Sequence, residues 1–253
     1  QTYEAIGRGT IIFSPDSKHL VYAVWTGEKR VMRDEKYAPW KGNQQFIVVD
    51  GVEGRPYDAV GGDNIVYSPD SKYLAYAAQK GQRVFAVMNG EEGEGYDGIG
   101  GGTFTFSPDS KHFAFVAQDN EKWTLVMNNQ KRNSYASIIK GGPIFSPDSQ
   151  HVAYVARENG KSFVVVDDVE GKRYDAIIGD SLVFSPDSKH LAYTAQEGKR
   201  QFVVIDENEG EEFNLAFTTR KNGIVFDSAH MVHYLALAEG SKAYLVRERI
   251  IPG

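Results

Sequence analysis

The sequence predicts an all-β protein, a six-bladed β-propeller with four antiparallel strands in each blade. The first observation is a motif, Phe-Ser-Pro-Asp-Ser-Lys-His-Leu-Ala-Tyr, that occurs in five close copies and in a worn sixth copy near the end of the chain. The leading aromatic residues are Phe13, Tyr67, Phe106, Phe145, Phe184 and Phe226. Their intervals of 54, 39, 39, 39 and 42 residues are the second observation. A period of about 40 residues with strand-like content is typical of propeller blades or of a solenoid.

Each repeat contains four segments that are predicted to be strands. In the fifth repeat an apolar run, residues 181–184, leads into Ser-Pro-Asp-Ser, where Pro and Asp favour a tight turn. Residues 190–195 then alternate with a period of two, and residues 201–205 form a third run after a short polar loop. In the fourth repeat an acidic turn at residues 167–171 comes next, and residues 174–178 are predicted to close the blade as its outer strand.

The two ends of the chain are predicted to meet in one blade. The sixth repeat continues through residues 243–246 and then stops without its copy of the outer strand. Residues 2–7, Thr-Tyr-Glu-Ala-Ile-Gly, match residues 57–61 and 174–177, so the N-terminal strand is predicted to complete the last blade. A ring closed in this way leaves only short, protected edges, whereas an open solenoid needs no such exchange. A closed ring of six blades is therefore favoured.

The whole chain, residues 1–253, is predicted to be a single propeller domain. With 41% apolar and 25% charged residues it can bury a sizeable core, and propellers of this length fold as one domain. The predicted blades are, in order, residues 8–60 with a long loop at 25–42, 62–99, 101–139, 140–178, 179–217, and 221–250 together with 1–7.

The composition limits the kinds of partner and chemistry that are expected of the protein. A formal charge of −6 and the lack of a basic stripe argue against nucleic acid, because phosphate binding needs clustered Lys and Arg. No stretch approaches the roughly 20 apolar residues of a membrane span. The chain has no cysteine, which excludes disulfides, thiolate catalysis and cysteine metal sites. We expect a monomer, and the start at Gln1 suggests a processed or trimmed N-terminus.

The blade signature Phe-Ser-Pro-Asp-Ser-Lys-x-Leu-Ala-Tyr resembles the WD-like repeats of TolB-type β-propellers, and the resemblance spans the entire chain. Such repeats also occur beside the catalytic domains of prolyl-oligopeptidase-type and tricorn-type proteases. The chain has no room for the α/β domain that precedes the TolB propeller, and it lacks the Gly-x-Ser-x-Gly elbow of a hydrolase domain. The resemblance implies a six-bladed disc that binds a protein or peptide across one face or in its channel. It also favours a periplasmic or extracellular location.

Repeated histidines and aspartates invite a metal-site interpretation. One repeat position, directly after the turn, holds His19, His112, His151 and His190. Blades are related by rotation, so equivalent side chains stand apart instead of converging as metal ligands must. We therefore expect each histidine to brace its turn by a hydrogen bond and each turn aspartate to be structural. The tyrosine that opens most outer strands is expected to pack between blades, and no cofactor is expected.

Function is better sought where the repeats differ, and the first departure is the loop between the second and third strands of blade one. By the intervals of 54 and 39 residues, this loop is 15 residues longer than its counterparts in blades two to four. Its predicted contact residues are Trp25, Arg33, Tyr37 and Trp40. Trp, Tyr and Arg are over-represented in binding hot spots, and long loops in compact domains are usually functional or disordered. The sequence alone leaves two interpretations of this loop open, a binding lid and a simple decoration or disordered segment.

The second departure is a set of residues just before each innermost strand, which are predicted to ring the mouth of the channel. The polar members are Arg8, Asp63, Lys140, Asp180, Lys221 and Asn222. In a ring of six blades, Asp63 faces Asp180 across the axis and Arg8 faces Lys140. Loops from fourth to first strand and from second to third strand emerge on the same face of a propeller, so the blade-one loop is predicted to lie over this mouth. The alternative is that these charges only keep the loops soluble.

Two functions from different classes fit the sequence. The favoured one is a binding module whose mouth and insertion loop take a protein, a peptide or a small anionic ligand. The alternative is a channel-sited hydrolase or lyase, in one form metal-dependent, with Asp63, Asp180 and Asn222 as oxygen ligands for a hard cation. Binding is favoured because only two carboxylates lie at the predicted mouth and basic residues stand beside them. No catalytic residue is assigned.

Overall fold

The computed structural model describes residues 5–7, 9–26, 44–139, 141–178, 180–217, 223–238 and 242–250. All regular structure in this part of the chain is β-strand, and it contains no helix that could cross a membrane. The residues divide into two compact units. Unit 1 consists of Gln1–Phe104 with Ala117–Asp119, and unit 2 consists of Thr105–Val116 with Asn120–Gly253.

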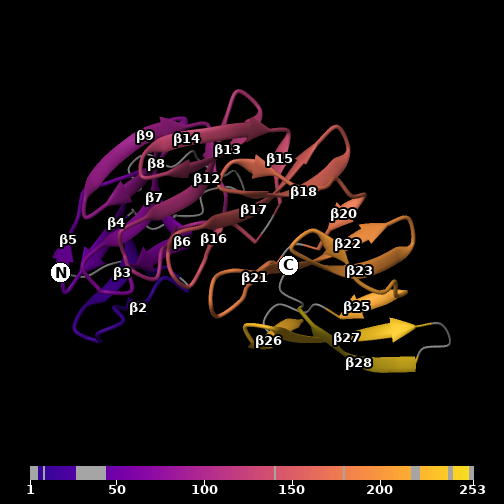
Figure 1. Cartoon of the computed structure of the whole chain (residues 1–253). Helices are drawn as coiled ribbons and strands as arrows, with labels where there is room; N and C mark the ends of the chain where they lie inside the picture. The colour runs from indigo at the N-terminus through magenta and orange to yellow at the C-terminus, as the bar shows by residue number, and fades with distance from the viewer. Residues whose placement is uncertain are drawn as a thin grey trace, which may run out of the picture. The chain divides into compact units, whose positions relative to one another are not determined.

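The strands of the described residues form six antiparallel sheets, the blades of a β-propeller (Figure 1). Unit 1 holds blade 1, which contains β1 (Ala5–Ile6), β2 (Ile12–Phe13), β3 (Leu20–Thr26), β4 (Gln44–Val49) and β5 (Val52–Glu53). It also holds blade 2, with β6 (Ala59–Tyr67), β7 (Leu74–Lys80), β8 (Arg83–Met88) and β9 (Glu91–Tyr96).

The division between the units falls within blade 3, which contains β10 (Gly98–Ile99), β11 (Thr105–Phe106), β12 (Phe113–Asp119), β13 (Lys122–Met127) and β14 (Gln130–Tyr135). Unit 2 holds blade 4, with β15 (Ser137–Ile138), β16 (Ile144–Phe145), β17 (Val152–Glu158), β18 (Lys161–Val166) and β19 (Val169–Glu170). Blade 5 contains β20 (Ala176–Ile177), β21 (Val183–Phe184), β22 (Leu191–Glu197), β23 (Arg200–Ile205) and β24 (Asn208–Glu209). Blade 6 contains β25 (Leu215–Phe217), β26 (Ile224–Ser228), β27 (Met231–Ala238) and β28 (Lys242–Arg249).

The inner strand of a blade is interrupted by a bulge. In blade 5, β20 and β21 both pair with β22, with Ile177 opposite Ala195 and Val183 opposite Ala192. The five residues 178–182 therefore stand opposite only two residues of β22, and the extra backbone must project from the sheet. Blade 2 has its bulge inside one continuous strand, β6, whose pairing with β7 shifts between Val60 and Ile65.

This pairing corrects the predicted blade boundaries. Residues 174–178 were predicted to close blade 4, but only Tyr174 pairs there, through a bridge to Ser162, while β20 begins the inner strand of blade 5. The chain passes from blade 4 to blade 5 at Asp175, because both the backbone N–H and the side-chain carboxylate of this residue bond to blade 5. Its N–H donates to the Glu197 carboxylate at 2.9 Å, and its Oδ2 accepts from the N–H of Gly198 at 2.7 Å. The outer strand of blade 4 is β19, next to β18.

The N-terminal segment, like β20, pairs with the second strand of the blade that follows it in the sequence. Ala5 pairs with Trp25 and Ile6 with Val24, so these two residues belong to blade 1, and the prediction that they complete the last blade is wrong for them. Residues 1–4 lie outside the described residues, so closure of the ring through them stays a prediction. In blade 6, β28 pairs with β27 from Lys242 to Arg249.

The apolar core lies between neighbouring blades. In unit 2, Val164 and Tyr174 of blade 4 pack with Tyr193 and Phe202 of blade 5. The rings of Tyr174 and Tyr193 meet edge to face with centroids 6.3 Å apart. In unit 1 the corresponding cluster includes Val21, Ile47, Tyr57, Ile65 and Tyr76. The tyrosine that follows the outer strand, Tyr174 in blade 4, thus packs between blades as predicted, and the burial of its ring contributes to the stability of the fold.

Candidate functional site

Each Ser-Pro-Asp-Ser turn is held together by its own side chains. In blade 4, Ser146 Oγ donates to Asp148 Oδ1 at 2.5 Å and accepts from the N–H of His151 at 2.9 Å. The Ser146 hydroxyl, followed by the N–H of Gln150, holds the pKa of Asp148 below its usual range. The serine-to-aspartate bond recurs from Ser14 to Asp16, Ser68 to Asp70, Ser107 to Asp109 and Ser185 to Asp187. The repeated aspartate therefore has a structural partner in its own turn.

The second serine of the turn joins neighbouring blades, a role that sequence reasoning missed. In unit 2 the N–H of Asp109 in blade 3 donates to Ser149 Oγ in blade 4 at 3.0 Å, and the N–H of Asp148 donates to Ser188 Oγ in blade 5 at 2.9 Å. Both serines are buried and have a φ of 65°, in the left-handed region. The equivalent pair in unit 1 is Asp16 and Ser71, at 3.0 Å. The signal in the sequence was that this serine is present in all five intact turns.

The histidine after the turn braces the next turn along the blade. His151 Nδ1 lies 2.6 Å from Asp167 Oδ2, and the other oxygen of Asp167 accepts from the N–H of Val152 at 3.0 Å. The same bond joins His19 to Asp50, His112 to Asn128 and His190 to Asp206. Each histidine thus makes a structural hydrogen bond, but with the turn after the third strand and not, as predicted, with its own Ser-Pro-Asp-Ser turn. Within the described part of the chain, no group of three or more His, Asp and Glu side chains is placed to hold a metal ion.

A hydroxyl group builds the bulge of the inner strand. In blade 5, Ser181 Oγ donates to the carbonyl oxygen of Ile178 at 2.5 Å and accepts from the N–H of Thr194 in β22 at 3.0 Å. In blade 1, Thr10 Oγ1 makes the same pair of bonds, to the Gly7 carbonyl at 2.8 Å and from the Ala23 N–H at 3.1 Å. The hydroxyl clamps the bulge to the second strand and fixes the residue before it in an exposed position.

Asp180 occupies that exposed position in blade 5. Its φ is 61°, in the left-handed region, and the same position in blades 1 and 3 is Gly9 with a φ of 76° and Gly102 with a φ of 69°. Left-handed backbone suits glycine, whereas a side chain there is strained. The carboxylate lies against blade 4, because a Cβ built on Gly141 would meet Asp180 Oδ1 at 2.7 Å.

Asp63 occupies the exposed position in the bulge of blade 2. A Cβ on Gly101 would lie 3.8 Å from its Oδ2, so the carboxylate reaches toward the bulge of blade 3. The bulges of blades 2 and 5 lie opposite the middle of the second strand. Asp63 and Asp180 therefore lie partway along inner strands, and the prediction that they belong to loops ahead of those strands is wrong. The reason is that the segment before each bulge already pairs within the same blade.

Trp25 is the third predicted site residue in the described part of the chain. It lies near the end of β3, paired with Ala5 and Gln45, and is half-buried. The other predicted residues lie outside the described residues, and they are Arg8, Arg33, Tyr37, Trp40, Lys140, Lys221 and Asn222. Asp63 belongs to unit 1 and Asp180 to unit 2, so their facing one another across an axis stays a prediction.

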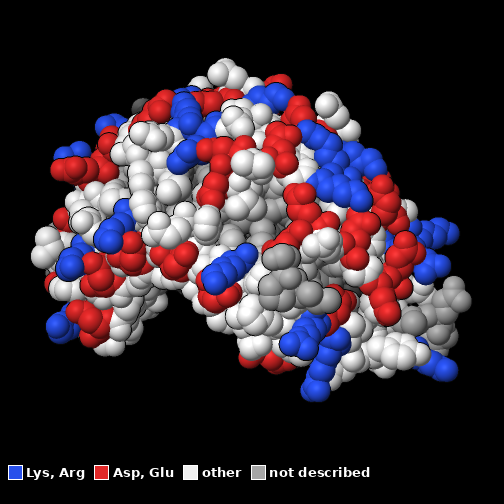
Figure 2. Space-filling model, in the orientation of Figure 1, with Lys and Arg blue, Asp and Glu red and all other residues white. Residues whose placement is uncertain are grey.

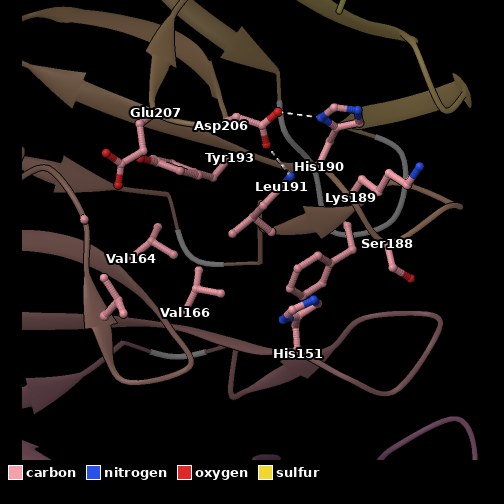
Figure 3. Close-up of a pocket in the computed structure, with 13 residues that line it drawn as sticks. His151, Val164, Val166, Ser188, Lys189, His190, Leu191, Tyr193, Asp206 and Glu207 are labelled. Atoms are coloured by element: carbon pink, nitrogen blue, oxygen red, sulfur yellow. Dashed lines mark hydrogen bonds and ion pairs between the residues drawn. The ribbon is translucent and has the colours of Figure 1, made fainter. Parts of the chain in front are cut away.

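A pocket that sequence reasoning missed lies between blades 4 and 5, beside the Ser-Pro-Asp-Ser turns (Figure 3). Its volume is about 260 Å³. The apolar lining includes Val164 and Val166 of blade 4 with Phe184 and Leu191 of blade 5. Polar lining residues include His151, Lys189, His190, Asp206 and Glu207. Val169 also lines the pocket and is 70% exposed, which is unusual for a valine.

Unit 1 contains a pocket at the same repeat positions, between blades 1 and 2, with a volume of about 380 Å³. Ile47, Val49 and Leu74 replace the apolar residues, and Val52, 72% exposed, replaces Val169. The hydroxyl of Tyr67, which also lines this pocket, is buried and has no hydrogen-bond partner among the described residues. The sequence signal for both pockets was a valine after the acidic turn of blades 1 and 4, where the other intact blades have Glu, Gln or Asn.

Charges of both signs are interspersed over the face shown in Figure 2. Ion pairs join charged residues of the described chain, such as Lys161 with Asp175 at 2.8 Å and Arg83 with Asp119 at 3.2 Å. The hydrogen bond from Lys161, followed by that from the N–H of Gly198, holds the pKa of Asp175 below its usual range. Such exposed pairs contribute little to stability.

Comparisons with known proteins support the fold and do not place the chain in a family. No protein-family profile matches the sequence, and no curated protein sequence matches it. A candidate dipeptidyl aminopeptidase IV from Bacteroides ovatus is similar in structure, with a TM-score of 0.51, 13% identity, and coverage of 90% of this chain and 44% of that one. At this identity the likeness shows the fold alone.

TolB, which the repeat signature resembles, is among the solved structures similar to the chain. The TolB structure from Acinetobacter baumannii has a TM-score of 0.41 and 16% identity, over 94% of this chain and 60% of TolB. The β-propeller domain of Cps50 (Swd1) from Myceliophteria thermophila has a TM-score of 0.38 and 12% identity, over 98% of this chain and 86% of that domain. The chain thus spans less than two thirds of TolB and less than half of the aminopeptidase.

Proposed function

We propose that the protein is a ligand- or protein-binding β-propeller scaffold whose binding surface combines the inner-strand bulges with the insertion of blade 1. The observation that carries this proposal is one exposed position of the bulge whose residue changes from blade to blade. The residues at this position are Gly9, Asp63, Gly102, Gly141 and Asp180. In blades 1 and 5 a hydroxyl holds the bulge to the second strand, whereas in blade 2 the side chain of Asn64 stands at the hydroxyl's position and bonds to the Gly100 carbonyl and the Thr103 N–H. A held backbone with a variable exposed residue is what a recognition surface requires.

The chemistry of the bulges favours a partner with cationic groups. Exposed carboxylates at Asp63 and Asp180 accept charge-assisted hydrogen bonds from Lys, Arg or a peptide N-terminus. Asp180 also holds a left-handed backbone at a cost of about 1 kcal/mol relative to a glycine free of strain. A binding role accounts for that cost. In the same proposal Arg8, Lys140, Lys221 and Asn222 take anionic groups of the ligand.

The insertion of blade 1 supplies the apolar part of the proposed surface. Trp25, which was predicted to begin the insertion loop, is the second-last residue of β3 and leads into the insertion. Arg33, Tyr37 and Trp40 within the insertion are of the residue types that dominate binding hot spots. The proposed ligand is accordingly a protein or peptide that offers basic groups to the bulges and an apolar segment to the insertion.

The proposal is tested by selecting peptides from a random display library on the immobilised protein and titrating the enriched peptides by calorimetry. We expect Asp63→Ala, Asp180→Ala and Trp40→Ala each to weaken binding at least about fivefold, because each removes a proposed contact. Glu91→Ala is the matched control, since Glu91 is an exposed carboxylate on the outer strand β9. Unchanged affinity in all three variants, or an equal loss in the control, would remove the proposal.

A further inference from the structure

The pocket between blades 4 and 5 contains a lysine that departs from its repeat. In three other turns the lysine pairs with the aspartate of its own turn: Lys18 with Asp16 at 3.6 Å, Lys72 with Asp70 at 3.1 Å and Lys111 with Asp109 at 3.2 Å. No such ion pair joins Lys189 to Asp187 among the described residues, and Lys189 instead lines the pocket (Figure 3). The ammonium group is thus available to a ligand.

The opposite end of the pocket carries an acidic side chain, Glu207, that likewise forms no ion pair among the described residues. Glu207 follows Asp206 in the turn between β23 and β24, at the position where Asp168 of blade 4 pairs with Arg132 at 2.7 Å. No Lys, Arg or His of the described residues forms an ion pair with Glu207. Its carboxylate lies over Gly171, where a Cβ would come within 2.8 Å of Glu207 Oε1. The glycine therefore keeps this position open for the carboxylate.

The remaining ionisable side chains of the lining, His151, His190 and Asp206, each have a hydrogen-bond partner. His190 Nδ1 lies 2.5 Å from Asp206 Oδ2, and Asp206 Oδ1 accepts from the N–H of Leu191 at 3.0 Å. His151, the other histidine of the lining, pairs with Asp167 at 2.6 Å. Figure 3 shows Lys189 and Glu207 at opposite sides of the pocket, with apolar residues such as Leu191 between them.

We propose that this pocket binds an extended peptide segment of a partner protein. An aliphatic or aromatic side chain of the segment fills the apolar lining, an acidic side chain pairs with Lys189, and a basic side chain pairs with Glu207. The charge pattern selects this occupant, because a purely apolar ligand would leave both charges without partners and an anion would meet Glu207 and Asp206. A volume of about 260 Å³ suits one side chain better than a whole small-molecule ligand.

The equivalent pocket of unit 1 has the apolar lining and the acidic residue Glu53, but its lysine is held in its own turn and it has no counterpart of Glu207. Its Lys72 is paired with Asp70, and Gly90 stands where the pocket of unit 2 has Glu207. The proposal therefore predicts one binding site for each chain, although two pockets are present. This site uses different residues from the inner-strand bulges, so either proposal can fail without the other.

The test is a calorimetric titration with two blocked peptides, Glu-Gly-Leu-Gly-Lys and Lys-Gly-Leu-Gly-Glu. Side chains two residues apart point to the same side of an extended chain, so each peptide presents both charges and the leucine to the pocket, in opposite chain directions. We expect one of the two to bind with a stoichiometry of one and a Kd of about 1 mM, and the binding to weaken at high salt.

Variants then separate this site from general surface binding. Lys189→Ala and Glu207→Gln should each weaken binding about fivefold, and Val169→Asp should abolish it. Lys111→Ala removes the equivalent lysine of blade 3, which is paired in its own turn, and should leave the affinity unchanged. The proposal is overturned if neither peptide binds at several times this concentration. It is equally overturned if a peptide with Ser in place of Leu binds with the same affinity, or if Lys189→Ala and Lys111→Ala change the affinity equally.

Discussion

The hydrogen bond between neighbouring turns allows the effect of one substitution on stability to be predicted. Ser149→Ala removes the oxygen that accepts the N–H of Asp109 at 3.0 Å, at a site where Ser149 is only 4% exposed. A net hydrogen bond contributes about 0.5–1.5 kcal/mol, and a buried donor left without a partner costs about 1–3 kcal/mol. We therefore expect the free energy of unfolding to fall by about 1–2 kcal/mol. At about 2–4 °C per kcal/mol for a chain of this size, Tm should fall by about 2–8 °C.

Ser17→Ala is the matched control for this prediction. Ser17 stands at the same repeat position in blade 1 with a φ of 60°, but its side chain is exposed and makes no hydrogen bond in the described structure. Both substitutions place alanine in left-handed backbone, so that cost cancels in the comparison. Urea unfolding followed by circular dichroism should show a change of about 0.5 kcal/mol or less for Ser17→Ala. Equal losses in the two variants would refute the idea that this serine joins blades.

Three further predictions follow from single residues. The Ser68 hydroxyl lowers the pKa of Asp70 from 3.8 to about 2. The ionised Asp70 carboxylate therefore stabilises the fold above pH 3.8, and this contribution is lost as the pH falls toward 2. Asp70→Asn should reduce the pH dependence of the urea midpoint over this range. Gly171→Ala places a Cβ 3.3 Å from the carbonyl oxygen of Val164, and should cost about 1–3 kcal/mol in thermal unfolding. Asp180→Gly relieves left-handed strain and should raise the free energy of unfolding by about 0.5 kcal/mol while weakening the selected peptides; a destabilised variant would contradict this.

The repeat period predicts the blades well because the information is local. Proline fixes a backbone angle and the turn aspartate bonds to its own turn, so the sequence alone indicates where one strand ends and the next begins. The assignment of β20 could not be predicted in the same way. Its period-two pattern fits either neighbouring blade, and the choice is made by the bonds from Asp175 to Glu197 and Gly198 in the following blade.

The candidate site shows the same limit at the level of side chains. Asp63 and Asp180 are recognisable from the sequence as departures from glycine, but their place partway along the strand depends on side-chain bonds of the next residue. Ser181 reaches the N–H of Thr194 in the second strand, whereas Asn64 reaches Gly100 and Thr103 in the bulge of blade 3. The sequence signals the pocket between blades 4 and 5 only through Val169, and the role of Lys189 could not be predicted because Lys189 and Lys111 lie in the same local sequence. Only their side-chain positions separate a paired lysine from one that lines a pocket.

We propose that the shared residues of the repeats hold the blades together, while the residues that depart from the repeat bind the ligand. The most direct measurement is a map of amide NMR shifts on adding a peptide selected on the protein. The account predicts that the largest changes fall in the bulges at residues 61–64 and 178–181, with little change at the same position of blade 3, Gly102. Changes of equal size at this position in all three blades, or changes confined to the outer strands, would contradict it.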